Sequence, residues 1–434
     1  MFFSSRASAR RPLLVLGTIL PALLVLTLPT AASHPYPTNG DATEGRAPTQ
    51  EELRPAVEAA FARQSYARDV TASLAFFNSA TGVRVQLFRS GAEQAQTIGN
   101  SELQGVPAAD PSWVGTVRPG RVVSIAIGDF PTGLYFARLT AADGRVGFAP
   151  FVLRPRRLGE HRVAVVMPTL TWQAYNFRDD DGDGKGDTWY ADWSRHTAGL
   201  ARPFLERGVP PHFRSYDLPF LHWLTRTGRV VDYLADADLD AAHGRALAAA
   251  YDLIVFPGHH EYVTSREYDA VQQFRDLGGN LAFLSANDFF RRVDVRGNEM
   301  HLIGLWRDLG RPEASLIGVQ YRANDEGQHR GPWTIRDAEA APWLFSGTGL
   351  QDGMPFASGG VEIDKTADGS PKGVKVLADI RNLIGPGLTA QMTYYQTARG
   401  AKVFAAGAFT LAGAALEPDV SRLLENLWAH LSTP

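Results

Sequence analysis

Apolar and polar positions follow two different patterns along the chain, and the first pattern occupies residues 66–155. Short segments rich in β-branched and aromatic residues alternate with period two, and Gly, Asp or Pro turns separate them, as in a β-sandwich. These segments are TASLAFFNS, GVRVQLFRSG, RVVSIAIGDF, GLYFARLTA and VGFAPFVLR. We therefore expect a β-sandwich domain over residues 65–157 that serves as a support or docking module.

After the segment RPRRLGEH the apolar runs become continuous, which is typical of strands buried on both faces of a parallel sheet. Four such runs follow: RVAVVMP, YDLIVFPG, NLAFLSAN and AKVFAAGA. Between the second and third, Thr264 and Glu267 form a capping box for an amphipathic helix that ends before Gly278. Another amphipathic helix closes the chain, with Leu423, Leu424, Leu427, Trp428 and Leu431. The alternation predicts an α/β domain with a parallel sheet over residues 160–434.

Ligands of an open parallel sheet bind beyond the carboxyl ends of its strands. Candidate chemistry should therefore be sought in the segments that follow the apolar runs. These segments are PTLTWQAYN, GHHEYVT, SANDFF and GAFTLAG.

The first 33 residues have the pattern of an export signal peptide. Three arginines precede an apolar run at residues 13–28, which Pro21 interrupts, and small residues follow at 31–33. We expect cleavage between Ala32 and His34 and a linker over residues 34–64. The mature protein is then secreted or extracytoplasmic and has no stable membrane span. An uncleaved anchor is the alternative.

Composition narrows the range of functions. A chain of 434 residues exceeds the usual size of a single core, so two domains are expected. The net charge of -3 gives no electrostatic reason to bind nucleic acid. The sequence contains no cysteine, which excludes disulfides, thiolate metal sites and a cysteine nucleophile.

The segments that follow the expected strands resemble a known family. PTLTWQAYN, RSYDLPFLHWL and the stretch from FPGHHEY to LAFLSAN are similar to the catalytic domain of the N,N-dimethylformamidase large (beta) subunit family. The resemblance extends over residues 65–434 and implies a domain with the class I glutamine amidotransferase-like, or flavodoxin-like, fold. It also implies hydrolysis of an N-substituted formamide to an amine and formate, at one iron ion held by two tyrosinates and a glutamate.

Matching the motifs residue by residue gives the site that the resemblance implies. Glu261 in GHHEY is the carboxylate ligand, and His259 two positions earlier is the catalytic histidine. Tyr175 in QAYN is the first tyrosinate, and Tyr216 in SYDLP is our choice for the second. Tyr190 in DTWY is the rival for that role. The stretch from 294 to 398 offers no match for residues that bind the substrate.

General chemistry is compatible with this ligand set. Two phenolates and a carboxylate carry three negative charges, which neutralise Fe(III), and a nearby cation can hold tyrosine as phenolate. Open positions on the metal would polarise an amide carbonyl and lower the pKa of a bound water. His259 would orient the substrate or pass a proton to the departing amine.

Each residue also has an ordinary structural interpretation. Tyr175 could be a half-buried aromatic, His259 a surface histidine, and Glu261 a carboxylate that the dipole of the following helix stabilises. Ser285 lies at a strand-to-helix turn, but LSAND lacks the glycines that flank a nucleophile elbow, so we interpret Ser285 as structural.

A second candidate metal site lies in the acidic segment NFRDDDGDGKGDTWY. Asp179, Asp181, Asp183 and Asp187 occupy positions 1, 3, 5 and 9 of an EF-hand pattern, but Tyr190 replaces the glutamate at position 12. The preceding segment has the pattern of a strand and turn, whereas an EF-hand needs a helix there. The open alternatives are another type of Ca2+ site and a solvated turn.

The sequence therefore predicts a secreted mononuclear-iron hydrolase that acts on a small amide or related C–N bond. The alternative is a non-catalytic extracellular module that binds glycans or proteins. Trp306, Trp333 and Trp343 would suit stacking on sugars in such a module. A second copy of the chain or a small partner subunit remains open as a partner.

Overall fold

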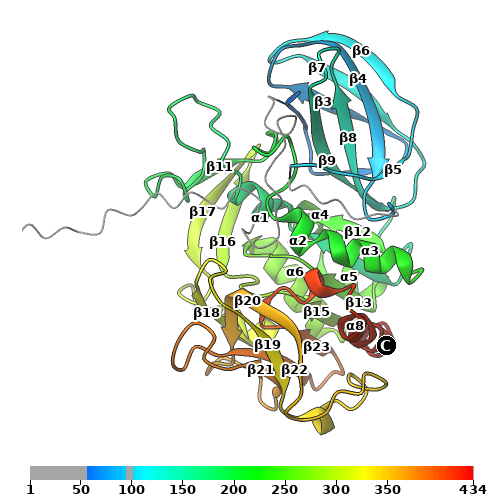
Figure 1. Ribbon diagram of the computed structural model, residues 1–434. Helices are drawn as coiled ribbons and strands as arrows, with labels where there is room; N and C mark the ends of the chain where they lie inside the picture. Colours follow the sequence, from blue (N-terminus) through cyan, green and yellow to red (C-terminus); the bar gives the residue numbers. More distant parts are fainter. Residues whose placement is uncertain (1–55, 94–100, 434) are drawn as a thin grey trace, which may run out of the picture. The chain divides into compact units, whose positions relative to one another are not determined.

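The computed structural model describes residues 56–93 and 101–433 (Figure 1). The expected signal peptide, its cleavage site and most of the expected linker lie outside these residues. No helix among the described residues combines the length and the apolar character that a bilayer span requires.

Two sheets form the first part of the described chain, and all five strands expected there are confirmed. One sheet is antiparallel and consists of β1 (Ala59–Phe61), β3 (Val70–Phe76) and β7 (Val122–Ile127). The other has the order β2 (Ser65–Ala67), β9 (Val146–Arg154), β8 (Gly133–Thr140), β4 (Ala80–Arg89) and β5 (Val106–Pro107), with β6 (Ser112–Val117) paired to β4. Only its β2–β9 pair is parallel.

Buried side chains of both sheets belong to one apolar cluster. Leu74 and Ile125 come from the first sheet, and Val85 and Leu139 from the second. β1 lies inside the range expected to be a linker, because the short segment AAF carries too little pattern to be recognised as a strand.

The α/β part contains a large mixed sheet. Its parallel half has the order β12 (Asp232–Ala235), β10 (Val163–Met167), β13 (Leu253–Phe256), β15 (Asn280–Phe283) and β23 (Lys402–Ala405). The four strands expected from continuous apolar runs are thus confirmed, and β12 is an additional parallel strand.

An antiparallel extension continues the sheet beyond β23 and was not expected from the sequence. Its strands are β22 (Ala390–Gln396), β21 (Lys375–Ile380), β19 (Arg330–Ile335), β20 (Pro355–Lys365) and β18 (Gln320–Asn324), with β24 (Ala408–Phe409) paired to β20. These strands carry the yellow to red-orange colours in Figure 1. Register shifts interrupt several of their pairings, which blurs the alternation that identifies a strand in a sequence.

The parallel strands are buried on both faces. In β10, Val163, Val165 and Met167 belong to one apolar cluster, whereas Ala164 and Val166 belong to another. Helices α3 (Leu218–Arg226) and α8 (Pro418–Leu431) contribute to the first cluster, and α4 (Asp236–Ala241), α5 (Gly244–Ala250) and α6 (Ser265–Asp276) to the second. The sheet therefore has a helix-bearing core on each side.

Both helices expected from the sequence are confirmed. The Thr264 hydroxyl accepts a hydrogen bond from the Glu267 backbone N–H at 3.1 Å, and the Glu267 carboxylate accepts one from the Thr264 N–H at 3.4 Å. This reciprocal pair is the expected capping box of α6.

The connection between β9 and β10 is tightly held. The buried Asp232 accepts hydrogen bonds from the backbone N–H groups of Gly159 and His161, and its side chain also meets the His161 ring at 2.8 Å. Leu134 and Phe148, from β8 and β9, belong to the same apolar cluster as the strands of the large sheet. A separate domain boundary near residues 157–160 stays a prediction.

Strand order identifies the edge of the sheet where a ligand would bind. β10 is first along the chain, β12 lies on one side of it, and β13, β15 and β23 follow on the other. This is the order 2-1-3-4-5, in which connections run in opposite directions on either side of the first strand. The crevice for a ligand is expected where the carboxyl ends of β10 and β13 meet.

A four-stranded sheet completes the fold beside this edge. It contains β11 (Thr197–Gly199), β17 (Glu299–Leu305), β16 (Arg291–Arg296) and β14 (Tyr262–Thr264). Three short helices accompany it and the large sheet: α1 (Thr169–Ala174), α2 (Phe213–Tyr216) and α7 (Ala314–Ile317). α1 corrects the expectation of a strand and turn directly before the acidic segment.

Candidate active site

Two connections bring the predicted residues to the β10–β13 edge. β10 leads into α1, and Tyr175 is the residue that ends this helix. β13 leads into the turn that contains His259 and Glu261, which continues directly into β14. Tyr175 therefore follows β10 and Glu261 follows β13. These are the two strands between which the direction of the chain connections reverses.

Backbone contacts fix the turn that carries Glu261. The His260 N–H donates to Asp288 Oδ1 at 3.0 Å, and the Glu261 carbonyl accepts from the Arg291 N–H at 2.9 Å. Gly258 is required before them, because a Cβ atom there would lie 2.2 Å from Asp217 Oδ1. The turn is thus held closely against its neighbours, which orients the Glu261 side chain.

Three oxygen-bearing side chains meet at the edge of the sheet. The Tyr175 hydroxyl donates to Glu261 Oε2 at 2.5 Å. The Tyr190 hydroxyl lies 2.8 Å from that of Tyr175 and 3.0 Å from Glu261 Oε2. The two phenol rings stack with their centroids 4.5 Å apart. Glu261 is buried, whereas both tyrosines are partly exposed, so the cluster has one open side.

A third phenol, that of Tyr262, contacts this cluster through Tyr190. The Tyr262 hydroxyl donates to the Tyr190 hydroxyl at 2.6 Å and accepts from Trp189 Nε1 at 2.9 Å. Trp189 and Tyr262 are fully buried in a small apolar cluster between α1 and the four-stranded sheet. This packing fixes the position of the Tyr190 hydroxyl.

Arg291 holds the other oxygen of the carboxylate. Its Nε donates to Glu261 Oε1 at 3.1 Å. Tyr175 contacts Oε2, and Tyr190 lies closer to Oε2 than to Oε1, at 3.0 against 3.3 Å. The carboxylate is therefore held in one orientation, with Oε2 toward the phenols.

His259 lies between two acidic side chains. Its Nε2 is 3.7 Å from Glu261 Oε2 and 3.5 Å from Glu362 Oε2. Neither Nε2 of His259 nor Oε2 of Glu362 has a hydrogen-bond partner among the described residues, although both atoms are buried. Buried polar atoms without partners are costly, so they mark a place where a ligand or water is expected.

Tyr216 lies at the end of α2 and reaches the same region through aromatic contacts. It stacks on His212 at 4.8 Å and packs edge-on against Phe409 at 5.1 Å between ring centroids. Phe409 in turn packs against His259 at 4.6 Å. The geometry leaves the choice between Tyr216 and Tyr190 as second tyrosinate to experiment.

Burial dominates the titration of these groups. It raises the pKa of Glu261, and the Arg291 guanidinium opposes that shift. Burial and the Glu261 carboxylate raise the pKa of Tyr175 and Tyr190 well above the ordinary value. Burial lowers the pKa of His259 and raises that of Glu362, so burial disfavours the charged form of both groups where they meet.

The donor set is chemically suited to a highly charged, hard cation. Phenolate and carboxylate oxygens are ligands that Fe(III) accepts, and a cation would supply the charge that turns the buried phenols into phenolates. Tyr175, Glu261 and either Tyr190 or Tyr216 would be the protein ligands. His259 and Glu362 would stand beside them as proton-carrying groups.

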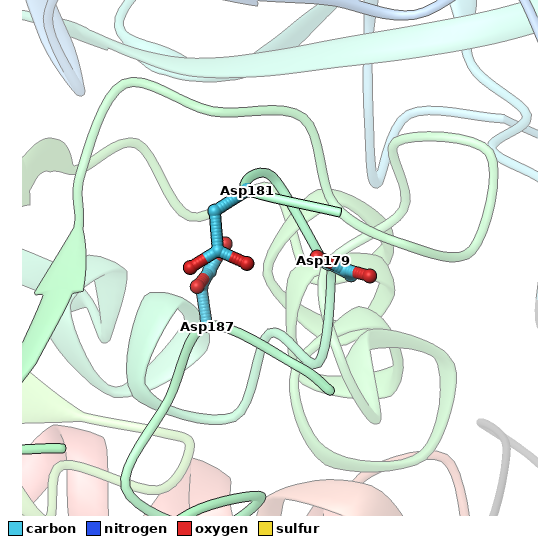
Figure 2. Close-up of side chains that lie close together, drawn as sticks. All are labelled: Asp179, Asp181 and Asp187. Carbon is cyan, nitrogen blue, oxygen red and sulfur yellow. The ribbon is translucent and has the colours of Figure 1, made fainter. Parts of the chain in front are cut away.

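The acidic segment forms a second group of carboxylates. Oxygens of Asp179, Asp181 and Asp187 lie within 4.8 Å of one another and could hold a metal ion (Figure 2). Asp183 is not part of this group; its carboxylate instead accepts from the Lys185 N–H at 2.8 Å. The set predicted from the EF-hand spacing is therefore only partly brought together.

Protein groups already compensate these carboxylates. Arg195 forms ion pairs with Asp187 and, at 2.7 Å, with Asp181. Asp179 accepts from the N–H groups of Gly182 and Gly184 at 2.7 and 2.9 Å. The loop thus has a network that satisfies its charges from within the chain.

A buried arginine connects this loop to the phenol cluster. Arg202 donates to the carbonyls of Gln173 and Asn176, on either side of Tyr175, at 3.1 and 2.8 Å. It also donates to Asp180 Oδ2 at 3.3 Å. The acidic segment therefore helps to fix the backbone from which Tyr175 projects.

Several residues near the site were not identified from the sequence. Tyr262 belongs to the recognised GHHEY motif, but nothing in the pattern indicates its contact with Tyr190. Glu362 and Arg291 come from regions without a matched motif. Ser285 is buried, and its carbonyl accepts from the Gly407 N–H at 3.1 Å, in keeping with a structural interpretation.

Two known proteins resemble part of this chain. N,N-dimethylformamidase beta subunits from Alcaligenes sp and Paracoccus aminophilus are 22% identical over 321 residues and 25% identical over 182 residues. These alignments span 59% and 42% of this chain but only 42% and 23% of the relatives. The chain therefore corresponds to less than half of either relative.

Solved structures add no argument about function. Superoxide reductase (neelaredoxin) from Ignicoccus hospitalis is 9% identical with a TM-score of 0.15, covering 27% of this chain and 99% of that chain. A cycloisomaltooligosaccharide glucanotransferase from Paenibacillus sp. is 11% identical with a TM-score of 0.16, covering 57% of this chain and 34% of that chain.

The family comparison covers the edge of the sheet and the residues that converge there. The family model described as N,N-dimethylformamidase beta subunit-like, C-terminal, matches residues 120–303 and 294–419. These segments include Tyr175, Tyr216, Glu261 and Glu362, and together they extend over more than half of the 434 residues. The chain therefore belongs to the N,N-dimethylformamidase beta subunit-like family.

Proposed function

We propose that this protein is a mononuclear-iron hydrolase of an amide or related C–N bond. The observation that carries the proposal is the convergence of Tyr175, Tyr190 and Glu261 at hydrogen-bonding distance beside an unpartnered His259 Nε2. Family membership adds independent support, since the named relatives are N,N-dimethylformamidases.

The proposal includes a finer description of the fold. The sheet order 2-1-3-4-5 supports an amidotransferase-like, flavodoxin-like catalytic domain, with the site at its reversal point. The cluster shared by the two N-terminal sheets supports a β-sandwich that acts as a support module. Fold alone does not specify a reaction, so the site has to carry the assignment.

The residues present can perform the proton transfers of amide hydrolysis. Bound to Tyr175, Glu261 and a second tyrosine, Fe(III) would polarise the amide carbonyl and acidify a water. His259 is held neutral, so its Nε2 can accept the proton of that water and return it to the departing amine. Glu362 lies 3.5 Å from His259 Nε2, and burial raises its pKa, so its carboxyl can supply a second proton. Arg291 orients Glu261 and opposes the rise that burial causes in its pKa.

Substrate, partner and location are also part of the proposal. The names of the relatives support a small amide as substrate and a partner subunit. The signal-like N-terminus supports a secreted or extracytoplasmic location. For the acidic segment, the group formed by Asp179, Asp181 and Asp187 supports a Ca2+ site that would stabilise the segment near Tyr175.

The alternative of a glycan-binding module loses its main support. Trp306 and Trp333 are buried, with 2% and 0% of their surface exposed, and Trp343 stacks on His430 at 3.8 Å. Trp306 and Trp333 therefore offer no free face for stacking on sugars, and His430 already stacks on the partly exposed Trp343.

Amine release from small amides tests the proposal. The full chain, reconstituted with Fe(III), should release amine from N-methylformamide or a related formamide, and Glu261→Gln should not. Arg292→Lys, which changes an arginine next to the site but outside it, is the matched control and should keep the activity. Absence of amine release from a panel of formamides and longer acyl amides, by an iron-loaded protein, would refute the hydrolase.

A further inference from the structure

Arg291 has a hydrogen-bonding edge that the protein does not use. Its Nε donates to Glu261 Oε1, and this is its only ion pair or hydrogen bond through the side chain within the described parts of the chain. The side chain is 22% exposed, and its two terminal nitrogens are not among the buried atoms that lack partners. Both terminal NH2 groups therefore face accessible space beside the phenol cluster.

The position of Arg291 is fixed by packing. Its guanidinium lies over the ring of the buried Phe290, 5.2 Å from the ring centre. Phe290 also packs against Tyr321 at 4.9 Å and against the guanidinium of Arg307 at 5.0 Å. Arg307 is engaged by Glu313, so it does not compete with Arg291 for a ligand.

Tyr321 supplies a second donor beside Arg291. Its hydroxyl has no hydrogen-bond partner within residues 56–93 and 101–433, and the side chain is partly exposed. Burial raises the pKa of Tyr321, Glu362 and Glu261 raise it further, and Arg291 opposes the shift. Tyr321 and Arg291 pack against the same ring, that of Phe290, which brings the two side chains into one neighbourhood.

Charge balance then selects the kind of ligand. If Glu261 and two phenolates neutralise Fe(III), as the proposed function requires, Arg291 keeps a positive charge without a counter-charge. Glu362 does not provide one, because its carboxyl faces His259 Nε2 at 3.5 Å and forms no ion pair with Arg291 among the described residues. An unpaired charge in a partly buried site is costly, and a bidentate carboxylate is the partner that a guanidinium edge fits best.

We propose that Arg291 and the Tyr321 hydroxyl bind a carboxylate group of the substrate. The substrate is then a small amide that carries a carboxylate near its scissile bond, as in an N-acylated amino acid. This inference rests on the proposed hydrolase for the charge balance and adds a substrate class to it. A carboxylate on the outer edge of the guanidinium lies within about 10 Å of Glu261, because each hydrogen bond spans about 3 Å. A substrate can therefore place its amide at Glu261 and its carboxylate at Arg291 if only a few covalent bonds separate the two groups.

A matched pair of probes tests the proposal directly. N-formylglycine and N-methylformamide share the formamide group and differ in the carboxylate. Calorimetric titration of the full chain, reconstituted with Fe(III), should show about 10- to 100-fold tighter binding of N-formylglycine, since charge-assisted hydrogen bonds are the strong ones. The preference should fall with added salt because the side chain is partly exposed.

Variants assign the preference to named side chains. Arg291→Lys keeps a cation beside Glu261 but loses the two parallel N–H donors that bind a carboxylate in bidentate fashion. Most of the preference for N-formylglycine should therefore disappear. Tyr321→Phe removes only a hydroxyl and should reduce the preference by about 3- to 10-fold, the effect of one hydrogen bond. Arg292→Lys, on the neighbouring position of β16, is the control and should bind like the unchanged protein. If Arg291→Lys does not fold, the result for Tyr321→Phe decides.

The outcomes separate this proposal from the proposed hydrolase. Equal binding of both probes overturns carboxylate recognition, even if N-methylformamide is hydrolysed. Formate that binds through Arg291 while the two probes bind equally also overturns it, since Arg291 then holds only the acid product. Preferential binding of N-formylglycine that depends on Arg291, in an iron-loaded protein that releases amine from no member of the amide panel, keeps the recognition site and rejects the hydrolase.

Discussion

The phenol cluster at Glu261 and the carboxylate group in the acidic segment both present oxygen ligands, but they differ in how their charges are compensated. In the acidic segment, Arg195 pairs with Asp181 and Asp187, and backbone N–H groups satisfy Asp179. In the phenol cluster, Arg291 is the only cation that contacts Glu261 within the described residues, and the Glu261 side chain is buried.

This difference indicates where a cation matters. A loop whose carboxylates already have partners gains little from binding a metal, because binding has to displace existing ion pairs. Buried phenols beside a carboxylate can ionise only if a cation is added. The number of acidic residues in a segment is therefore a weaker guide to a metal site than the absence of internal compensation.

The largest effect is expected from changing the carboxylate of the phenol cluster. Glu261→Gln should reduce bound iron from about one ion per chain to a small fraction and lower amide hydrolysis by at least about 1,000-fold, since the charged ligand is lost. Asp187→Asn in the acidic segment is the matched change and should leave iron unchanged. Metal analysis of both variants measures this, and equal iron loss in the two would remove the distinction between the sites.

A somewhat smaller effect is expected from His259. His259→Ala should retain iron but slow turnover by about 100- to 10,000-fold, which is the usual contribution of general acid–base catalysis. The change should appear in kcat more than in KM, because the imidazole is expected to act on the reacting atoms. Turnover that stays within about threefold would show that Nε2 takes no part in the reaction.

The pH dependence of folding stability should differ in sign between two groups of acidic residues. The buried pair Asp236 and Glu267 should stabilise the fold less as the pH rises, and Asp192 should stabilise it less as the pH falls. Burial raises the pKa of Asp236 to about 6 and that of its neighbour Glu267 well above the ordinary value. The folded protein therefore keeps protons that the unfolded chain releases near pH 4, and stability should fall as the pH rises from about 4 through 6. For the Asp236 shift alone the loss is about 3 kcal/mol.

Asp192 beside the acidic segment should behave in the reverse way. Its hydrogen bond from the Ser194 hydroxyl lowers its pKa to about 2, so its stabilising effect is lost only as the pH falls toward that value. Urea unfolding at pH 4.5, 6 and 8 measures the slope. Glu267→Gln should flatten it, while Asp192→Asn should leave it unchanged in this range; the same slope in all three proteins would contradict the expected proton uptake.

The smallest effect is expected from calcium. Adding Ca2+ should raise the Tm by a few degrees at most, because about 1 kcal/mol corresponds to roughly 2–4 °C in a domain of this size. Asp181→Asn should abolish the shift, whereas Asp183→Asn should keep it, since Asp183 does not belong to the group of three. A shift that persists in Asp181→Asn would show that the group of three does not bind Ca2+. A shift above about 10 °C would show that the acidic segment depends on a bound cation as strongly as we expect for the phenol cluster.

The sequence predicts those parts of the fold where hydrophobic burial dominates. Continuous apolar runs identify β10, β13, β15 and β23, because a strand buried on both faces needs apolar residues at every position. β12 escapes recognition because it is short and contains Asp232, whose buried carboxylate is satisfied by the β9–β10 connection and by the Tyr251 hydroxyl.

The site is predictable only where a motif carries it. Tyr175, His259 and Glu261 follow apolar strands, so topology and family resemblance both point to them. Glu362 sits in the polar-looking segment VEIDK of β20, and it is buried with a hydrogen bond from the Asn324 side chain at 2.8 Å, a pairing that sequence patterns do not reveal. The contact of Tyr190 with Glu261 depends on the path of the acidic segment, which sequence spacing does not define.

Iron content and the visible absorption spectrum of the purified full chain together test the central claim most directly. About one Fe(III) per chain and a broad visible charge-transfer band from tyrosinate are expected. The band should bleach in Tyr175→Phe and in only one of Tyr190→Phe and Tyr216→Phe, which identifies the second tyrosinate. A colourless protein that takes up no iron on reconstitution would contradict the assignment of the phenol cluster as an iron site.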